Sequence, residues 1–396
     1  MRILHSLTSH AIVSAIALGV AALAVAGVQA WQATEAGGRL VFIGTYTGGT
    51  TNSKGIYAFR FDEKTGALTP LGLKAETRSP SFLAASPDGK VLYAVNEIHD
   101  YNGTTAGSIT SYTVDAKTAT LTPLGVESTG GSDPCHVQCD RTGKVVAVAN
   151  YSGGNFAVLP IGPGGKPGAS TALLGGTGSG PDKQRQQGPH AHEVVFDPSN
   201  RYLLEADLGL DKILVYRFDA ASGKVTPNDP PSVSLVPGSG PRHLVFHPNG
   251  KFVFTINEMA STITTLTWDG AKGALAMLGS QSTLPDGFTG NSSTAEIQVH
   301  PNGRFLYGSN RGHDSIAVFS IAADGTLKAV EHESTRGKTP RHFTLDPSGR
   351  WLIAGNQGSG TLSVFAVDQS TGALTPTGGL AEVGAPVCVL FWPEPR

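Results

Sequence analysis

The chain repeats one pattern of apolar and polar positions. In Gly240 to Glu258, "GPRHLVFHPNGKFVFTINE", two β-rich apolar runs flank the turn signal "HPNG". Six copies of this turn occur, and a short apolar run, usually opened by proline, precedes each of them. The copies begin at Ser86, Asp140, Asp197, His247, His300 and Asp346. Short apolar runs separated by tight turns predict paired β-strands.

Each copy continues with a third run, such as "SIAVFSI" at Ser315–Ile321, and several end in a hairpin like "DQSTGALTP". Four short strands in roughly 45 to 55 residues are typical of a β-propeller blade. A seventh blade is divided: "APVCVLFWP" supplies its first strand, and "GRLVFIGTY", "GIYAFRF" and "ALTPLG" supply the other three. We therefore expect an all-β, seven-bladed propeller of four-stranded antiparallel blades over residues 36–396, closed by the terminal strands. A sandwich pair or a β-solenoid would not explain the divided repeat.

This topology predicts where polar residues meet. If the first strand runs away from the upper face and the second returns, the start of one lies beside the end of the other. Arg242 and Glu258 should then be neighbours near the propeller axis. Long connections at Glu97–Gly107, Gly162–Gly188 and Leu284–Ala295 are expected on the same face, which favours that face for function.

Composition narrows the class of protein. The sequence has 51 glycines, 25 prolines and 15% charged residues, which favours turns and short strands over long helices. A formal net charge of −2 gives no basic surface for nucleic acid. The closed blades and modest charge give no reason to expect more than a monomer.

The first thirty residues read as a signal peptide. Arg2 precedes an apolar run from Ala11 to Ala26, and Val28–Ala30 offers small residues for cleavage, with Ala24–Ala26 as an alternative. The run is short for a membrane span, although an uncleaved anchor is the alternative. Residues 1–30 are therefore expected to direct a periplasmic or secreted protein with no stable membrane insertion after cleavage. Its net charge would be −3, from 28 basic and 31 acidic residues.

The three cysteines, Cys135, Cys139 and Cys388, are too few and too uneven for a disulfide framework in an exported chain. "CHVQC" invites a metal-site interpretation. On a strand, however, Cys135 and Cys139 would be about 13 Å apart at about 3.3 Å per residue. Buried thiols are the preferred interpretation, and neither a metal nor a cofactor is expected.

Polar residues at the strand ends form the candidate site. The first strands begin with His136, His190, His192, Arg242, His243, Glu296, Arg341 and His342. Asn96, Asn150, Asn257, Asn310 and Asn356 end the second strands, where asparagine commonly satisfies the backbone of the next turn. His243 and His342 read on balance as structural bridges between blades.

The residues that break the repeat are His190, His192, Arg242, Glu258 and Arg311. His190 and His192 are two apart, so they share one face of a strand. A neutral histidine can take a proton from water, and arginine can hold a carboxylate or phosphate and a developing oxyanion. The alternative is a set of salt bridges between blades.

With these residues the chain resembles the seven-bladed propeller lactonases, which include propeller-type 6-phosphogluconolactonase and fungal carboxy-muconate cycloisomerase. The matching segments include "FIGTYTGG", "GPHAHEVVF", "GPRHLVFHPNGKFVFTINE" and "SNRGHDSIAVF", and they extend over essentially the whole mature chain. The resemblance implies a site of His190 or His192, Arg242, Glu258 and Arg311.

The expected activity is hydrolysis of a small anionic sugar-acid lactone. His190 or His192 would activate water, Glu258 would orient it or return the proton, and Arg242 would assist. The expected substrate contacts are Arg311, Arg341, His136 and His243. An export signal fits poorly with a phosphorylated cytoplasmic substrate. A muconate-type cycloisomerase and a non-catalytic exported binding propeller are the alternatives.

Overall fold

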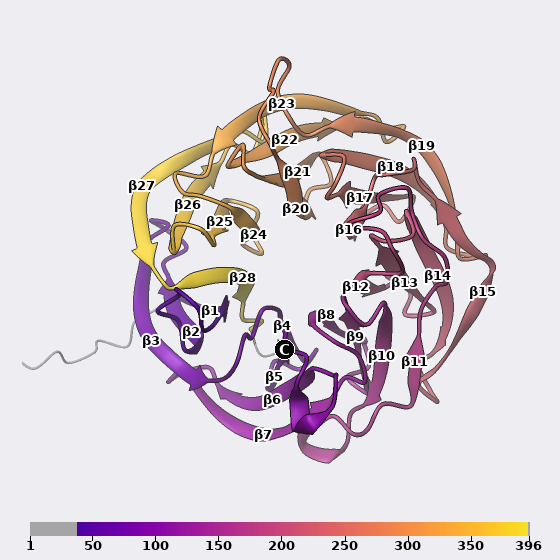
Figure 1. Ribbon diagram of the computed structural model, residues 1–396. Coiled ribbons are helices and arrows are strands. Elements are labelled where there is room, and N and C mark those ends of the chain that lie inside the picture. Colours follow the sequence, from indigo (N-terminus) through magenta and orange to yellow (C-terminus); the bar gives the residue numbers. More distant parts are fainter. Residues whose placement is uncertain (1–37, 395–396) are drawn as a thin grey trace, which may run out of the picture. The chain divides into compact units, whose positions relative to one another are not determined.

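The computed structural model describes residues 38–394, and the predicted leader, residues 1–30, lies outside the described residues. In the described part, seven four-stranded antiparallel sheets stand side by side around a common centre (Figure 1). The all-β, seven-bladed propeller predicted from the sequence is confirmed. No helix among these residues has the length and apolar character to cross a bilayer.

The strands are as follows, blade by blade. The first complete blade contains β4 (Leu83–Ala85), β5 (Val91–Asn96), β6 (Ser108–Asp115) and β7 (Thr120–Ser128). The second contains β8 (Pro134–Cys139), β9 (Val145–Asn150), β10 (Asn155–Pro160) and β11 (Ala172–Leu174). The third contains β12 (Ala191–Phe196), β13 (Tyr202–Asp207), β14 (Lys212–Asp219) and β15 (Lys224–Ser234). The fourth contains β16 (Pro241–Phe246), β17 (Phe252–Asn257), β18 (Thr262–Asp269) and β19 (Ala274–Ser282). The fifth contains β20 (Ser293–Val299), β21 (Phe305–Arg311), β22 (Ser315–Ile321) and β23 (Leu327–Ser334). The sixth contains β24 (Pro340–Leu345), β25 (Trp351–Asn356), β26 (Thr361–Val367) and β27 (Leu374–Glu382). Two 3₁₀ turns, η1 (Tyr101–Gly103) and η2 (Pro163–Gly165), interrupt the connections.

The seventh blade is assembled from both ends of the chain. It contains β28 (Ala385–Phe391), β1 (Arg39–Tyr46), β2 (Gly55–Phe61) and β3 (Leu68–Glu76), in that order. β28 pairs antiparallel with β1, so that Val41 lies opposite Phe391 and Gly44 opposite Cys388. The divided repeat predicted from the sequence therefore forms a seventh complete sheet. This sheet closes the ring between the sixth and first blades, so no open sheet edge remains there.

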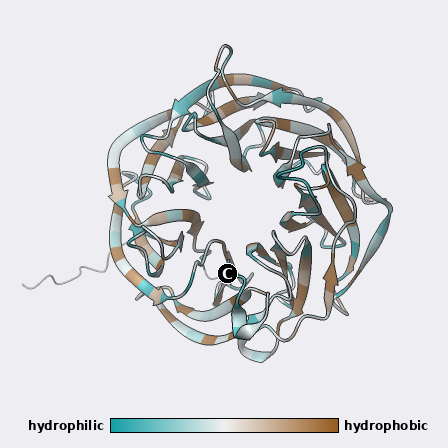
Figure 2. Ribbon diagram, in the orientation of Figure 1, coloured by the Kyte–Doolittle hydropathy of each residue, from teal (hydrophilic) through white to brown (hydrophobic). Residues whose placement is uncertain are grey.

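The core lies between neighbouring blades. Every residue of β17, "FVFTIN", is buried, because adjacent sheets cover both faces of the second strand. This explains why the second strands read as nearly continuous apolar runs. Apolar residues, brown in Figure 2, lie on strands all around the ring. Phe254 and Phe319 come from neighbouring blades and pack in one cluster with no exposed surface. Burying each such side chain contributes about 1.5–3 kcal/mol.

The turns after the first strands also join blades. In the "HPNG" copies, His247 Nδ1 accepts from the Asn249 N–H at 3.0 Å, and its Nε2 donates to the Gly303 carbonyl of the next blade at 2.7 Å. His300 donates in the same way to Gly349 at 2.8 Å. These histidines therefore lock successive blades at the lower face.

Asparagines at the ends of the second strands fix the connections on the upper face. The Nδ2 groups of Asn150, Asn310 and Asn356 donate to the carbonyls of Thr129, Thr283 and Thr335 respectively. The expected structural role is confirmed for these three, whereas Asn257 donates to the hydroxyls of Thr262 and Thr264. The partner differs from the expectation, because the first three amides hold the connection arriving from the preceding blade rather than the next turn.

The long connection at Gly162–Gly188 is only partly on the upper face. It contains η2 and β11, and β10 runs away from that face, so the segment begins at the lower end of the blade. The stretch that crosses the upper face therefore starts after Leu174. The connections at Glu97–Gly107 and Leu284–Ala295 lie on the upper face as predicted, since they follow a second and a fourth strand.

Replacing Asn310 by alanine tests this fastening. Asn310 is fully buried, donates to the Thr283 carbonyl at 2.8 Å and accepts from the Thr283 hydroxyl at 2.7 Å. Because the Thr283 carbonyl would lose its donor, we expect Asn310→Ala to lower the free energy of unfolding by about 1–3 kcal/mol. Urea unfolding followed by fluorescence measures the change. Asn291→Ala, on an exposed connection, is the control and should change stability by less than about 0.5 kcal/mol. Equal effects of the two substitutions would contradict the role of Asn310.

Candidate active site

A β-bulge near the start of the first strand recurs around the ring. In β16, Pro241 pairs with Asn257 and His243 with Ile256, which leaves Arg242 as the extra residue. The same irregularity occurs in β8, β12, β20, β24 and β28. Consecutive strand residues normally point to opposite faces, and a bulge re-aims one of them. Arg242 and His243 consequently approach each other, with Nη1 and Nε2 3.3 Å apart.

The carboxylate of Glu258 lies among three guanidinium groups. Its Oε2 is 3.2 Å from Arg242 Nε and 2.9 Å from Arg311 Nη2, and its Oε1 is 2.6 Å from Arg185 Nη2. We call these four residues the Glu258 cluster. The sequence-based expectation that Arg242 and Glu258 are neighbours is confirmed. With three cations and one anion, the cluster carries a net positive charge.

Burial and charge compete within the Glu258 cluster. Burial alone would raise the pKa of Glu258, but the Arg311 and Arg242 cations outweigh it and hold that pKa well below its usual range. Burial, with the charges of Arg341 and Arg311, lowers the pKa of Arg242 to about 10. At neutral pH Glu258 is therefore an anion and Arg242 remains a cation.

His192 occupies the bulged position of β12 and is 4% exposed. Its Nδ1 is 3.8 Å from Cys135 Sγ, and its ring packs edge-on against Tyr151 and His243 at 5.5 and 5.3 Å between centroids. Burial, reinforced by Arg242, lowers the pKa of His192 well below its usual value. His192 is thus a neutral imidazole beside the positive Glu258 cluster.

His190 lies two residues earlier, just before β12. Its ring stacks on Tyr151 with centroids 4.6 Å apart, and its Nδ1 is 3.0 Å from the Tyr151 carbonyl oxygen. A carbonyl can only accept, so His190 Nδ1 donates in this contact. Its backbone N–H donates to Asp207 at 2.9 Å. These contacts hold the His190 ring against the Tyr151 blade.

Arg341, at the bulge of β24, lies over the ring of Tyr46 at 5.2 Å. The Tyr46 hydroxyl donates to both carboxylate oxygens of Glu97, at 2.8 and 2.9 Å. Within residues 38–394, the Arg341 guanidinium has no hydrogen-bond acceptor and no carboxylate partner. A stacked and oriented arginine whose N–H groups remain available is suited to an anion or a carbonyl oxygen.

A second layer of polar residues lies one residue further along the first strands. We call it the lower layer, and it consists of His136, Glu193, His243, Glu296 and His342. Three of its members accept a backbone N–H from the next blade: His136 and His342 accept from Val194 and Val389, and Glu193 accepts from Leu244. The expected bridging role of His342 is confirmed.

His243 and Glu296 form the pair nearest to Arg242. His243 Nδ1 is 2.7 Å from Glu296 Oε2, and burial raises the pKa of Glu296 to about 8. Phe82 fills the space among the lower-layer histidines, with its ring 4.3, 5.9 and 5.5 Å from those of His136, His243 and His342. The lower layer is therefore a packed floor beneath the Glu258 cluster.

The structure brings most of the sequence-predicted residues together. His192, Arg242, Glu258 and Arg311 interact directly or through shared neighbours, and Arg341 influences the same charges. His136 and His243 lie in the lower layer, buried at 4% and 2% exposure.

Sequence reasoning missed Arg185, Tyr46 and Glu193. Tyr46 is the last residue of β1, the second strand of the divided blade. Its position is equivalent to that of Glu258, which follows β17 in the fourth blade. That equivalence was readable from the sequence. Arg185 was not readable, because it lies in a connection outside the repeat.

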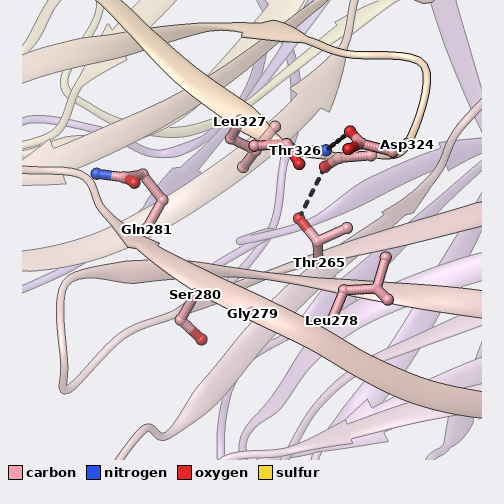
Figure 3. Close-up of a pocket in the computed structure, with 9 residues that line it drawn as sticks. Thr265, Leu278, Gly279, Ser280, Gln281, Asp324, Thr326 and Leu327 are labelled. Atoms are coloured by element: carbon pink, nitrogen blue, oxygen red, sulfur yellow. Dashed lines mark hydrogen bonds between the residues drawn. The ribbon is translucent and has the colours of Figure 1, made fainter.

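The exterior of the propeller offers different chemistry. A groove of about 390 Å³ lies between the blades of β18–β19 and β22–β23 (Figure 3). Among the described residues that line it, the one ionisable side chain is Asp324, whose carboxylate already accepts from Thr326 N–H at 2.9 Å. This groove is a less suitable reaction site than the Glu258 cluster.

The cysteines and possible metal ligands are also placed. Cys135 and Cys388 are buried and Cys139 is half-buried, all as free thiols, so the buried-thiol interpretation is confirmed for the first two. In the part of the chain that the structure describes, no three His, Cys, Asp or Glu side chains converge in a geometry that would hold a metal ion.

Comparisons with known proteins agree with this architecture. Residues 40–391 match the family described as "Lactonase, 7-bladed beta-propeller". The 6-phosphogluconolactonase of Bacillus subtilis is 36% identical, over 88% of this chain and 97% of that protein. The structure of the periplasmic gluconolactonase of Pseudomonas aeruginosa is similar with a TM-score of 0.83 and 34% identity, covering 90% of this chain and 99% of that one. The chain belongs to the seven-bladed β-propeller lactonase family.

Proposed function

We propose that this lactonase hydrolyses the ring ester of a small anionic sugar-acid lactone at the Glu258 cluster. The observation that carries the proposal is a buried, neutral His192 beside a cluster with net positive charge. Such a site attracts an anion and supplies a proton acceptor in one place. The names of the relatives from Bacillus subtilis and Pseudomonas aeruginosa support a sugar-acid lactone as substrate.

The proposed reaction begins with attack of water on the lactone carbonyl carbon. His192 takes a proton from the water as the new carbon–oxygen bond forms, and Arg341 and Arg242 stabilise the oxyanion. The bond from the carbonyl carbon to the ring oxygen then breaks. The protonated His192 returns its proton to that oxygen, and the product is an open hydroxy acid that ionises to the carboxylate.

Glu258 has a positioning role in this proposal. The sequence left open whether it would orient water or return the proton to the leaving oxygen. A carboxylate whose pKa is held well below its usual range by Arg311 and Arg242 carries no proton at neutral pH. We therefore assign Glu258 the task of holding the arginines in place, and we assign proton return to His192.

His192 is preferred over His190 because of its surroundings. Arg242, Glu258 and Arg341 all influence the charge of His192. His190 stacks on Tyr151 and donates from Nδ1 to the backbone there, which favours a role at the edge of the site.

His136 and His243 are proposed as supports. His243 contacts Arg242 from below and Glu296 on its other nitrogen, and His136 bonds to the next blade. These contacts favour roles in orienting Arg242 and the floor over the direct substrate contact expected from the sequence.

Export of the mature chain is also proposed, as a monomer. The leader pattern in residues 1–30 motivates it, and the Pseudomonas aeruginosa relative is named a periplasmic enzyme. An exported enzyme would meet lactones outside the cytoplasm, which explains how a chain with this leader can belong to a lactonase family.

Substitution of His192 tests the reaction. We expect His192→Ala to lower kcat by about 10²–10⁴-fold, because the general base is removed. The measurement is pH-stat hydrolysis of 6-phosphogluconolactone, gluconolactone and a muconolactone by the mature chain. His99→Ala, which changes an exposed histidine paired with Asp133, is the matched control. Full turnover by His192→Ala would move the role of base to His190. An inactive wild-type protein would favour a non-catalytic binding propeller. Turnover of the muconolactone alone would favour a cycloisomerase.

The charge state of Glu258 gives a pH prediction for stability. Its pKa is lower in the folded protein than the value of about 4.3 for an unfolded glutamate, so its stabilisation is fully present above that value. The stabilisation is lost as pH falls through the folded-state pKa. We expect Glu258→Gln to cost about 3 kcal/mol at pH 7, and the difference from wild type to shrink below about pH 4. Urea unfolding from pH 3 to 8 measures it, with exposed Glu382→Gln as the control. A difference that stays constant down to pH 3 would contradict the pairing.

A further inference from the structure

Arg185 fills a gap in the ring of residues that follow the second strands. That register holds Tyr151 after β9, Leu208 after β13 and Glu258 after β17. Leu208 is fully buried and offers no polar group. Arg185, from the connection between β11 and β12, reaches across this blade. Its Nη2 donates to the Tyr151 hydroxyl at 3.1 Å and to Glu258 Oε1 at 2.6 Å.

The segment that carries Arg185 is firmly built. The neighbouring Gln186 has no exposed surface, and its Nε2 donates to the Leu208 carbonyl at 2.9 Å and to Asp211 Oδ1 at 2.8 Å. Asp182 Oδ1 accepts from the Arg185 N–H at 3.0 Å, and Gln186 N–H donates to the Asp182 carbonyl at 2.8 Å. Arg185 is therefore presented by an ordered turn, which lowers the entropy cost of using it to bind a ligand.

Arg185 also has capacity for a further partner. Its side chain is 45% exposed, against 13% for Arg311 and 3% for Arg242, so it is the outermost arginine of the Glu258 cluster. Both of its polar contacts use Nη2, and within residues 38–394 its Nε and Nη1 groups have no acceptor. Arg242 and Arg311 already balance the charge of Glu258.

We propose that Arg185 is a specificity-determining residue that binds an anionic tail, a phosphate or a carboxylate, at the end of the substrate remote from the lactone ring. The free Nε and Nη1 groups of a planar guanidinium can each donate to an oxygen of either group. The inference rests on the proposed lactonase site and adds to it the selection between charged and neutral lactones.

The test measures ligand binding and turnover separately. Calorimetry with 6-phosphogluconate, glucarate and gluconate is compared for the mature wild-type chain, Arg185→Met, Arg185→Lys and the control Lys183→Met, an exposed cation in the same turn. We expect Arg185→Met to weaken the binding of 6-phosphogluconate at least tenfold more than the binding of gluconate. Arg185→Lys should restore part of the loss, and Lys183→Met should match wild type. A larger loss of affinity for 6-phosphogluconate identifies the tail as a phosphate, and a larger loss for glucarate identifies it as a carboxylate.

Each other outcome has one meaning. Equal weakening of all three acids by Arg185→Met would overturn the inference, because Arg185 would then act only through Glu258. No weakening of any acid would overturn it as well. If wild type binds the charged acids through Arg185 but hydrolyses no lactone, the proposed function fails while the assignment of Arg185 stands. In an active enzyme, the ratio of KM for charged and neutral lactones should shift in the same direction as the binding.

Discussion

Pairing of β28 with β1 is the constraint on which the rest of the structure depends. The Glu258 cluster draws on the third-blade connection and on the fourth and fifth blades, while Arg341 and Tyr46 come from the sixth and seventh. None of these residues is close to all the others in sequence. Their distances are fixed only when every blade is clamped between two neighbours, which requires the two ends of the chain to complete one sheet. Closing so long a loop is entropically costly, and burial along all the blade interfaces offsets that cost.

Within the closed ring, the Glu258 cluster places several charges out of water. Removing Arg242 and Glu258 from water carries a penalty, which the arginine cations outweigh for Glu258 but which lowers the pKa of Arg242. Burial, together with repulsion from the Arg341 and Arg311 cations, lowers the pKa of Arg242. A protein under selection for stability alone would place apolar residues here, as it does throughout the second strands. Retaining net positive charge at this point is therefore better explained by ligand binding than by folding.

Much of this could be read from the sequence, and the failures have physical causes. The six turns and the divided repeat predicted the blades, because a propeller imposes one apolar pattern on each unit. Departures from that pattern then identified Arg242, Glu258 and Arg311 as candidate site residues. Arg185 was not predicted, because a connection between strands has no repeated pattern against which a departure could be recognised. Glu193 was not predicted, because strand alternation places His192 and Glu193 on opposite faces. The bulge in β12 breaks this alternation and turns both side chains toward the centre.

The bulge also explains why one dipeptide can serve two purposes. In "RH", Arg242 reaches up to Glu258 while His243 reaches down to Glu296. Without the extra residue, one of the two would point into the space between blades, where a cation has no partner. The same backbone irregularity recurs in six blades, and in β16 it separates Arg242, in the Glu258 cluster, from His243, in the lower layer. The bulged residue differs between blades, as His192, Arg242 and Arg341 show, while the residues that follow them, Glu193, His243 and His342, each bond to a neighbouring blade. Chemistry on this scaffold can therefore diverge at the bulged residue without disturbing the contacts that hold the blades together.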